Sequence, residues 1–480
     1  MKKILSMSIA MILLVGVVTA AWAQGTRSTA FQIENLGTNP ADMTIYYYDA
    51  STGNLTCTDT VSALGSFKSV QFNQAAACSS TGASCICGQT TWRGSVVIES
   101  TEPIAVVTNI NEPTPANVLY AGGAYGGIPD TRTATEIVLP LVMHDYYGYN
   151  TDFAIQNAGA VSATINLDFY PTGSTTPVKT EGPFTVKPGA SYYRNQKTDD
   201  TNLPRSWSGV VVVRSDQPVA GVVNENPDTQ GTLLNYEGFA SGDSQIYMPF
   251  LAKNYYNFST AFQVVALANG TAGTISFYRT GASSPDATLD INLNKYGSLQ
   301  WNMKTDTAYT TGSIPNDWSG AGVINLTSGS AVAIVNERGK TGAGYNLGLT
   351  YSGMNNSLLK GKMAFPFIVK NYAGAKWNTA FQIVNVGGAA GAVTVHYDAL
   401  DGSGFSSYTW TSPSLNPNQS LECNQKLGTC IDSPLPDGWV GSVRVEGASG
   451  SGVVLAGICN ERGGTTTGDS GLVYNGFPYD

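Results

Sequence analysis

The feature that most constrains the fold is a stretch that the chain repeats. Residues 245–263 hold a proline inside an apolar run, then an Asn-Tyr-Tyr turn, then Thr-Ala-Phe-Gln. Closely similar stretches stand at 137–156 and 363–382, and residues 29–32 keep only the second half. Self-similarity of this kind indicates a chain built of tandem units. We therefore interpret the sequence as a four-fold repeat whose first copy lacks its leading strand.

Three further markers recur in one order in every copy: Trp-x-Gly, then Asn-Glu about twenty residues later, then Tyr-x-Gly. The Trp, Glu and Tyr residues of these motifs are Trp92, Trp207, Trp318 and Trp439; Glu112, Glu225, Glu337 and Glu461; and Tyr120, Tyr236, Tyr351 and Tyr474. The markers divide the chain into repeats 24–134, 135–242, 243–360 and 361–480.

Each copy has the pattern of an all-β unit. Short alternating runs are separated by Gly, Pro, Asn and Asp turns, and no segment keeps a period of 3.6 residues. Roughly seven short strands in such a unit predict an immunoglobulin-like β-sandwich, with a jelly roll or barrel as the alternative. A propeller is disfavoured because its blades are shorter than these repeats. The short linkers predict a semi-rigid rod of four sandwiches.

Residues 1–23 have the pattern of a cleaved signal peptide. Lys2 and Lys3 precede an apolar run, which ends at Ala21-Trp22-Ala23. This arrangement predicts export, with a single-pass anchor as the alternative reading. No later run is apolar and long enough to predict a transmembrane helix. The expected location is extracellular or on a bacterial cell surface.

Charge and composition narrow the class of partner. The chain has 25 basic and 34 acidic residues and a formal charge of −9, so it is not suited to nucleic acid or anionic membranes. Charged residues make up only 12%, whereas Gly (54) and Tyr (25) are abundant. This balance favours exposed β-structure outside the cell.

The seven cysteines lie in the first and last copies only. In an exported protein they favour disulfides, although spacing does not give the connectivity. Such bonds would staple the two copies that have a neighbour on one side. The disulfide candidates are Cys57, Cys78, Cys85, Cys87, Cys423 and Cys430. Cys459 is expected to be a buried thiol, with an intermolecular bridge as the alternative.

The sequence offers little for catalysis. Its two histidines, His144 and His396, lie in different copies, which argues against a catalytic or metal site built on histidine. We expect no enzyme and no cofactor. The repeated Glu is expected to order a strand end, with a calcium ligand as the alternative and a glycosidase pair as a weaker one.

Aromatic residues are expected to serve mainly in packing. The repeated Trp should fill the sandwich core beside the Phe of Thr-x-Phe, and its Gly should let the facing sheet approach. Tyrosine clusters at 46–48, 146–149, 192–193 and 255–256 suit domain interfaces. Stacking on sugar rings is the alternative for these clusters.

The missing leading strand suggests a way to assemble. An unpaired sheet edge in the first copy would invite a strand from another chain. The C-terminal Phe477-Pro478-Tyr479 repeats the apolar-Pro-apolar pattern of a leading strand. We therefore expect head-to-tail association, in which this segment meets the first copy near Phe31 of the next subunit. Capping of the edge by residues 24–28 is the alternative.

The whole arrangement resembles the tandem immunoglobulin-like β-sandwich proteins of bacterial cell surfaces. The resemblance rests on the repeated architecture and covers the chain after its signal. It implies a secreted structural protein, a subunit of an extracellular fibre or surface assembly that associates with itself. The alternative is an adhesin that binds surface glycans through exposed aromatic residues.

Overall fold

The computed structural model describes residues 27–74, 92–113, 120–199, 202–227, 231–340, 346–464 and 468–480. Almost all of its elements are antiparallel strands, so the predicted all-β fold is confirmed. The helical elements of the described ranges are two short 3-10 turns, η1 (Asp130–Arg132) and η2 (Asn356–Leu358). None of the described helices has the length and apolarity to cross a membrane. The signal segment 1–23 and Cys78, Cys85 and Cys87 lie outside the described residues.

The strands fall into four groups, here called copies 1 to 4. Copy 1 contains β1 (Ser28–Asn35), β2 (Ala41–Asp49), β3 (Leu55–Leu64), β4 (Ser69–Asn73), β5 (Gly94–Ser100), β6 (Ile104–Pro113) and β7 (Tyr120–Gly126). Copy 2 contains β8 (Ala134–His144), β9 (Tyr149–Asn157), β10 (Ala163–Pro171), β11 (Lys179–Val186), β12 (Ser191–Asn195), β13 (Trp207–Pro227) and β14 (Leu234–Glu237). Copy 3 contains β15 (Gln245–Lys253), β16 (Ser259–Ala266), β17 (Thr271–Arg279), β18 (Ala287–Leu293), β19 (Ser298–Asn302), β20 (Thr311–Gly312), β21 (Trp318–Ser328), β22 (Ala331–Lys340), β23 (Asn346–Ser352) and β24 (Met354–Asn355). Copy 4 contains β25 (Lys362–Val369), β26 (Asn378–Asn385), β27 (Val393–Ala399), β28 (Tyr408–Thr411), β29 (Ser420–Asn424), β30 (Val440–Gly447), β31 (Leu455–Arg462), β32 (Gly471–Asn475) and β33 (Phe477–Tyr479).

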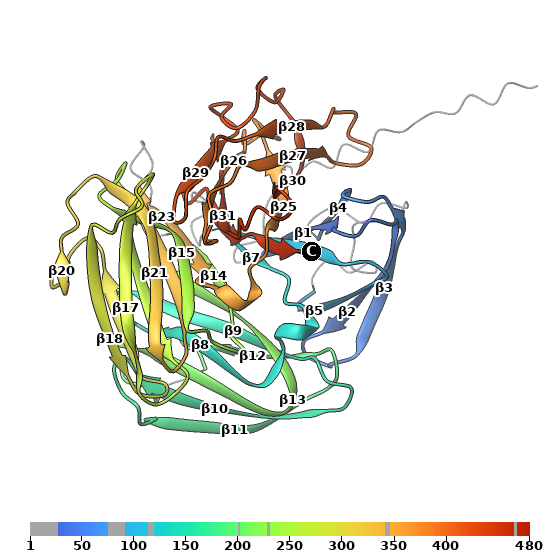
Figure 1. Cartoon of the computed structure of the whole chain (residues 1–480). Helices are drawn as coiled ribbons and strands as arrows, with labels where there is room; N and C mark the ends of the chain where they lie inside the picture. The colour runs from blue at the N-terminus through green and yellow to red at the C-terminus, as the bar shows by residue number, and fades with distance from the viewer. Residues whose placement is uncertain are drawn as a thin grey trace, which may run out of the picture.

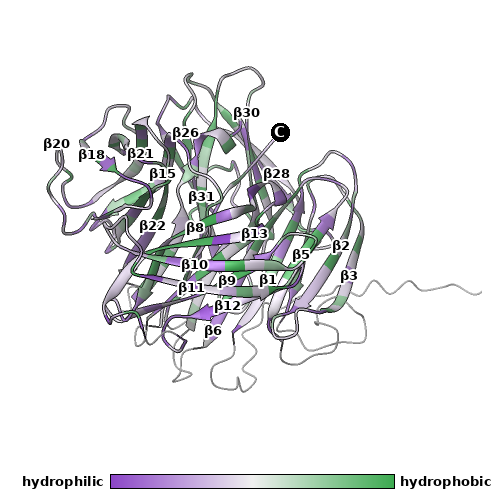
Figure 2. Ribbon diagram, turned by 90° about the horizontal axis from the view of Figure 1, so that it is seen from below, coloured by the Kyte–Doolittle hydropathy of each residue, from purple (hydrophilic) through white to green (hydrophobic). Residues whose placement is uncertain are grey.

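Each copy is a sandwich of two antiparallel sheets. The Phe sheet, which contains the Thr-x-Phe strand, has the order β4-β1-β6-β7 in copy 1, β19-β16-β22-β23 in copy 3 and β29-β26-β31-β32 in copy 4. The Trp sheet, which contains the Trp-x-Gly strand, runs β3-β2-β5, β20-β18-β17-β21-β15-β24 and β28-β27-β30-β25-β33 in the same copies. In copy 2 the long strand β13 takes part in both sheets and joins them. Apolar and polar residues alternate along many strands, which turns one face toward the core (Figure 2).

The leading strand sits at the same place in three copies. β8, β15 and β25 each pair with the Trp-x-Gly strand, and the pairing shifts register around Pro140, Pro249 and Pro366. Proline lacks the N–H that a regular ladder needs, so a bulge is where a sheet tolerates it. In the described part of copy 1, β5 pairs with β2 alone and forms the edge of its sheet.

In copies 2, 3 and 4 the repeated Trp is buried in the same apolar core as the Phe of Thr-x-Phe, as predicted, but its ring contact in copies 2 and 4 is with another aromatic residue. Its ring lies beside an aromatic residue of the neighbouring strand in its own sheet, as in Tyr47–Trp92, Phe169–Trp207 and Tyr397–Trp439 at 5.9–6.2 Å between centroids. The Phe of Thr-x-Phe stacks elsewhere, Phe31 on Phe72 and Phe381 on Phe365. The glycine is needed because the ring folds back over it. A Cβ at Gly209 would lie 2.0 Å from the Tyr170 carbonyl oxygen and 2.7 Å from the Trp207 ring.

The four copies close into a ring instead of the expected rod (Figure 1). The last strands of the Phe sheets, β7, β14, β23 and β32, each contact the next around the centre, and β32 returns to β7. Asp469 strengthens this centre by accepting hydrogen bonds from the backbone N–H of Leu233 and Gly348. Copy 1 then packs on copy 4 through a small apolar cluster of Leu36, Ala105, Ala364 and Tyr479. The chain therefore turns at each junction instead of extending as a rod (Figure 1).

Candidate functional site

Several contacts recur at the junctions between copies, and the hydrogen bond of a buried glutamine is the first of them. Gln263 of copy 3 donates its Nε2–H to the Pro140 carbonyl of copy 2. Gln382 of copy 4 donates to the Pro249 carbonyl at 2.8 Å, and Gln32 of copy 1 donates to the Pro366 carbonyl of copy 4. Copy 2 has Ala154 at this register position, next to Phe153. The Gln is thus absent at the junction where the described residues of the preceding copy form no leading strand.

An Asn–Glu pair is the second element of the junctions. Asn336 Nδ2 donates to Glu225 Oε2 at 2.9 Å, and Asn109 Nδ2 donates to Glu461 Oε2 at 3.0 Å. Glu225, Glu337 and Glu461 are at most 1% exposed. Burial raises the pKa of Glu225 and of Glu337 to about 7 and that of Glu461 to about 8. Glu225 and Glu461 thus bind the next copy, and the charge of Arg462 in copy 4 opposes the rise in the pKa of Glu337.

Glu112 does not belong to this set. Strand register places Ile110 opposite Thr29, as Glu337 lies opposite Thr260, so Ile110 takes the glutamate position in copy 1. Glu112 lies two residues farther along and forms an ion pair with Arg27 at 2.7 Å. Tyr125, not Tyr120, takes the position of the closing tyrosine, since it faces Thr108 as Tyr351 faces Val335.

An arginine stacked on an aromatic ring is the third element. Arg338 of copy 3 lies 3.9 Å from the ring centroid of Tyr149 and 3.7 Å from Glu225 Oε2, both in copy 2. Arg462 of copy 4 lies 4.3 Å from the ring centroid of Phe258 in copy 3. Junctions 2/3 and 3/4 therefore share one arrangement of cation, ring and carboxyl group.

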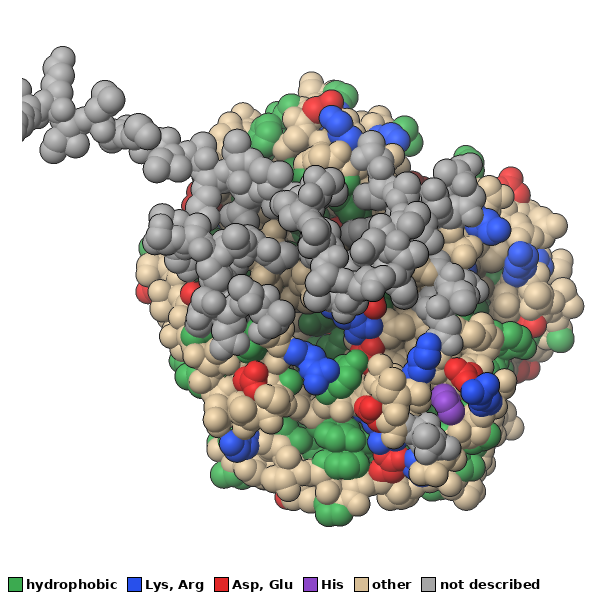
Figure 3. All heavy atoms as spheres, turned by 180° about the vertical axis from the view of Figure 1, so that it is seen from behind, with side chains coloured by type: hydrophobic (Ala, Val, Ile, Leu, Met, Phe, Trp, Pro, Cys, Tyr) green, Lys and Arg blue, Asp and Glu red, His purple; other side chains and the backbone are tan. Residues whose placement is uncertain are grey.

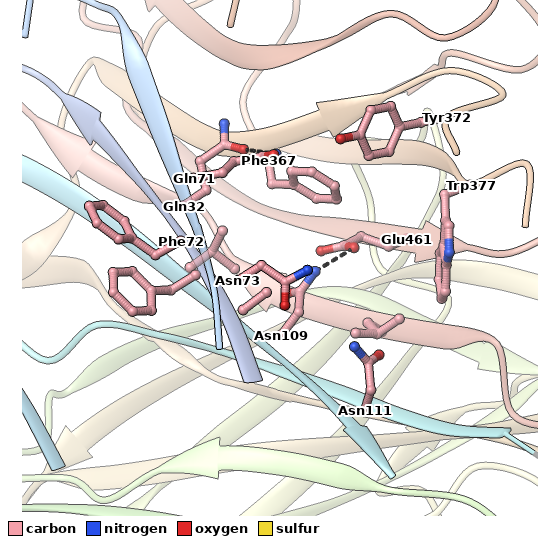
Figure 4. A pocket seen from close by; sticks show the side chains of 14 residues that line it. Gln32, Gln71, Phe72, Asn73, Asn109, Asn111, Phe367, Tyr372, Trp377 and Glu461 are labelled. Atoms are coloured by element: carbon pink, nitrogen blue, oxygen red, sulfur yellow. Dashed lines mark hydrogen bonds between the residues drawn. The ribbon is translucent and has the colours of Figure 1, made fainter. Parts of the chain in front are cut away.

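A pocket of about 50 Å³ opens at the junction between copies 4 and 1 (Figure 4). Copy 4 contributes Phe367, Tyr372, Trp377, Glu461 and Leu472, and copy 1 contributes residues of β1, β4 and β6. In Figure 4 Glu461 lies between Asn109 and Trp377, and Asn111, which also lines the pocket, lies below them. Basic and acidic side chains on the face shown in Figure 3 are interspersed and do not form a patch of one sign.

The predicted assembly residues serve within one chain. β33 pairs with β25 of its own copy, with Pro478 opposite Met363. Tyr479 is 7% exposed and donates its hydroxyl to Glu446 at 2.7 Å. Phe477 reaches copy 1, where a Cβ at Gly126 would lie 2.9 Å from its ring. The structure thus brings the C-terminal segment to the first copy, as expected, but to the first copy of the same molecule, and Phe31 is buried in that copy's own core.

The edge strand β5, which pairs on one side only within the described residues, lies at the junction with copy 2. Val96, Val97 and Ile98 of β5 are only half-buried, whereas Val211, Val212 and Val213 of the matching strand in copy 2 are fully buried. Other contacts hold this junction. Arg27 is hydrogen-bonded to Asp152 and Asn226 of copy 2, and Ser95 donates its hydroxyl to the Gly189 carbonyl.

The cysteines partly follow the expected division. Cys423 and Cys430 form a disulfide, and Cys57 is also disulfide-bonded. Cys459 is a free, fully buried thiol, and burial raises its pKa well above the usual range. Of the residues that the structure describes, no three His, Cys, Asp or Glu side chains gather as metal ligands would.

The tyrosine clusters divide between packing and exposure. Tyr47 is buried, and Tyr192 stacks on Phe184 at 4.3 Å. Tyr147 of copy 2 and Tyr256 of copy 3 lie at matching turns and are 83% and 78% exposed. His144 is buried and contacts the Leu203 carbonyl through Nδ1 at 2.9 Å, and His396 lies on β27.

The contacts described above are derived from the structure of this chain alone. A comparison of the chain with protein-family models and with curated proteins finds no match.

Proposed function

We propose that the protein is a secreted, non-enzymatic structural protein of a bacterial surface or extracellular assembly, and that copy 1 accepts a β-strand from a partner. The observation that carries the proposal is the edge of β5. It is the one Trp-x-Gly strand in the described residues that pairs on one side only. An unpaired edge with half-exposed apolar side chains is the kind of surface to which an extended segment adds by main-chain hydrogen bonds.

The leading strands of the other copies indicate what the added strand looks like. β8, β15 and β25 are apolar segments with one central proline, and each buries its face between two sheets. A partner segment of the same pattern would cover Val96, Val97 and Ile98. The donor is not the C-terminus of a second copy, because β33 is already paired within its own chain. We therefore propose an apolar strand from another component of the assembly.

Hydrogen exchange with a strand peptide tests the proposal. The peptide is residues 134–144, the leading strand of copy 2, and the control is the same peptide N-methylated at alternate residues. We expect the unmodified peptide to protect the amides of Gly94–Ser100 and the control to leave them unchanged. Unchanged exchange in β5 at saturating peptide, with each of the three leading strands tried in turn, would reject strand addition.

Glycan binding is a second candidate because of Tyr147 and Tyr256. Each pairs with the preceding tyrosine, at 4.7 Å for Tyr146–Tyr147 and 4.6 Å for Tyr255–Tyr256. Exposed aromatic faces at matching positions suit stacking on sugar rings. A glycan array with the protein and with the Tyr147→Ala/Tyr256→Ala double variant decides this point. Signals that survive in the folded variant would exclude these rings as the platform.

A further inference from the structure

The four junctions differ in how they balance a buried glutamate. At junction 2/3, Arg338 lies beside Glu225 and over the Tyr149 ring. At junction 3/4, Arg462 lies over the Phe258 ring, and its charge opposes the effect of burial on the pKa of Glu337. At junction 2/3 the arginine thus contacts both the ring and the carboxyl group of the preceding copy, and at junction 3/4 it lies over the ring and acts on the carboxyl group through its charge.

Junction 4/1 keeps the ring and the carboxyl group but not the arginine. Trp377 bridges to Tyr372 as Phe258 bridges to Tyr255, so it takes the ring position, and Glu461 takes the glutamate position. Asn111 lies opposite Ser28, where Arg338 lies opposite Ser259, so an asparagine stands at the arginine position.

At junction 1/2 both the glutamate and the arginine are replaced by other residues. Ile110 replaces the glutamate in copy 1, and Asn226 stands at the arginine position in copy 2. Neither residue is charged, so these two positions need no charge compensation. Within the described residues, the glutamate without its cation is confined to junction 4/1.

The pocket occupies the place of the absent arginine. It is lined by Asn111, Trp377 and Glu461 and has a volume of about 50 Å³. Glu461 is 1% exposed, and its Oε1 is buried without a hydrogen-bond partner in the described structure. A water molecule needs roughly 10–15 Å³ of such space, so the pocket has room for a group of a few non-hydrogen atoms. Gln71 and Asn73 of its lining are half-exposed, so one side of the pocket reaches the surface.

We propose that this pocket binds a guanidinium group supplied from outside the chain. The Glu461 carboxyl group, whose pKa burial raises to about 8, releases its proton to the solvent when the cation binds. The resulting carboxylate supplies the opposite charge and a free oxygen for a charge-assisted hydrogen bond. Trp377 supplies the aromatic face, and tryptophan is the strongest partner for a stacked cation. The planar guanidinium matches both, as it does at the two junctions where the chain provides its own. The group belongs either to a small molecule or to an arginine side chain of a partner, and this site is independent of the β5 edge.

Calorimetry on the purified full chain tests the proposal with methylguanidinium chloride as the probe. Urea is the control, because it has the same planar shape without the charge. We expect saturable binding of one methylguanidinium per chain and none of urea. Glu461→Gln, which keeps the size of the side chain, should weaken binding at least tenfold. Asn111→Arg should abolish it, because the new side chain would lie over Trp377 as Arg338 and Arg462 lie over their rings.

A gain of binding makes the test specific. Arg462→Asn recreates the same mismatch at junction 3/4, beside Glu337 and Phe258, and should add a second site. Equal binding of urea, absence of methylguanidinium binding at 10 mM, or unchanged binding in folded Asn111→Arg would overturn the proposal. Agmatine and an end-blocked Gly-Arg-Gly peptide distinguish the sources. Tighter binding of agmatine indicates a small molecule, and tighter binding of the peptide indicates an arginine of a partner.

Discussion

Glu461 should make the stability of the protein depend on pH, and Glu461→Gln should remove that dependence. The carboxyl group is 1% exposed, and its Oε2 accepts a hydrogen bond from Asn109 at 3.0 Å. Glutamine has nearly the same shape and retains an oxygen that accepts this hydrogen bond, but it never ionises. The substitution therefore isolates the effect of the buried charge.

The magnitude follows from the shift in pKa. Burial raises the pKa of Glu461 from 4.5 to about 8, because ionising the group inside the protein removes the charge from water. A folded state that holds a proton which the unfolded state has lost becomes less stable as the pH rises. The stabilising contribution is complete below the unfolded pKa and is lost as the pH rises through the folded pKa. The expected slope in this window is about 1.4 kcal/mol per pH unit, so about 3 kcal/mol is lost from pH 5 to pH 7.5.

Urea denaturation of both proteins at pH 5.5, 6.5, 7.5 and 8.5 measures this effect. We expect the free energy of unfolding of Glu461→Gln to exceed that of the natural protein by an amount that grows with pH. Glu225 and Glu337 titrate in both proteins and cancel in the difference. Cys459 and Tyr474, whose pKa values the Glu461 charge raises further, stay neutral throughout this range. The exposed Glu99→Gln serves as the control for losing one surface charge. A difference that is flat, or that shrinks as the pH rises, would refute the reasoning.

Three further perturbations test the ring and its sheets. Gly320→Ala should destabilise copy 3 by about 3 kcal/mol or more in thermal unfolding, because the new Cβ would lie 1.9 Å from the Tyr278 carbonyl oxygen. The control is Gly388→Ala, which has open space around it and should be nearly neutral. Gln32→Ala should lower the free energy of unfolding by about 1–3 kcal/mol, because it removes the side chain that donates to the buried Pro366 and Gly441 carbonyls. Equal stability of the variant and the natural protein would contradict the closed ring. Truncation after Gly476 removes β33 from its contacts with β25 and with copy 1. We expect faster hydrogen exchange in β25 and on that face of copy 1, and protection equal to that of the full chain would count against ring closure.

The sequence contains the all-β pattern and most of the positions that later meet at the junctions. Thr-x-Phe-Gln and Asn-Glu were visible as repeats, because a residue that serves the same contact in each copy recurs at the same spacing. The sequence did not show which residue of the neighbouring copy each of them contacts. Glu225 and Gln263 look like ordinary strand residues until the neighbouring copy is placed against them.

Spacing along the chain selected the wrong residue in copy 1, which departs from the other copies. Counting from Trp92 selects Glu112, but the strand pairing of Phe31 with Thr108 puts Ile110 at the glutamate position. Spacing along the chain cannot fix strand register, since a shift of one residue turns a side chain to the opposite face. One signal was available in the sequence, namely Ala154 in place of the repeated Gln. It marks the junction at which the described part of copy 1 has no leading strand.

The rod was a wrong prediction for a related reason. Short linkers limit how far two neighbouring copies can separate but not the angle between them. That angle is set by side chains such as Tyr296, which reaches from copy 3 to Glu136 of copy 2 with a hydrogen bond of 2.6 Å. A small turn repeated at each junction brings the fourth copy to the first.

Closure between copies 1 and 4 also has a consequence for the order of folding. The hydrogen bond from Gln32 to Gly441 joins residues 409 positions apart, and the Glu461–Asn109 contact spans 352. Contacts of such sequence separation form late, because the chain between them must first be confined. During synthesis, the face of copy 1 that holds Gln32, Leu36 and Phe67 therefore waits, uncovered, until the last quarter of the protein has emerged. Nascent chains are most exposed to misassociation in that interval, when the first copy of one molecule is able to meet the finished fourth copy of another.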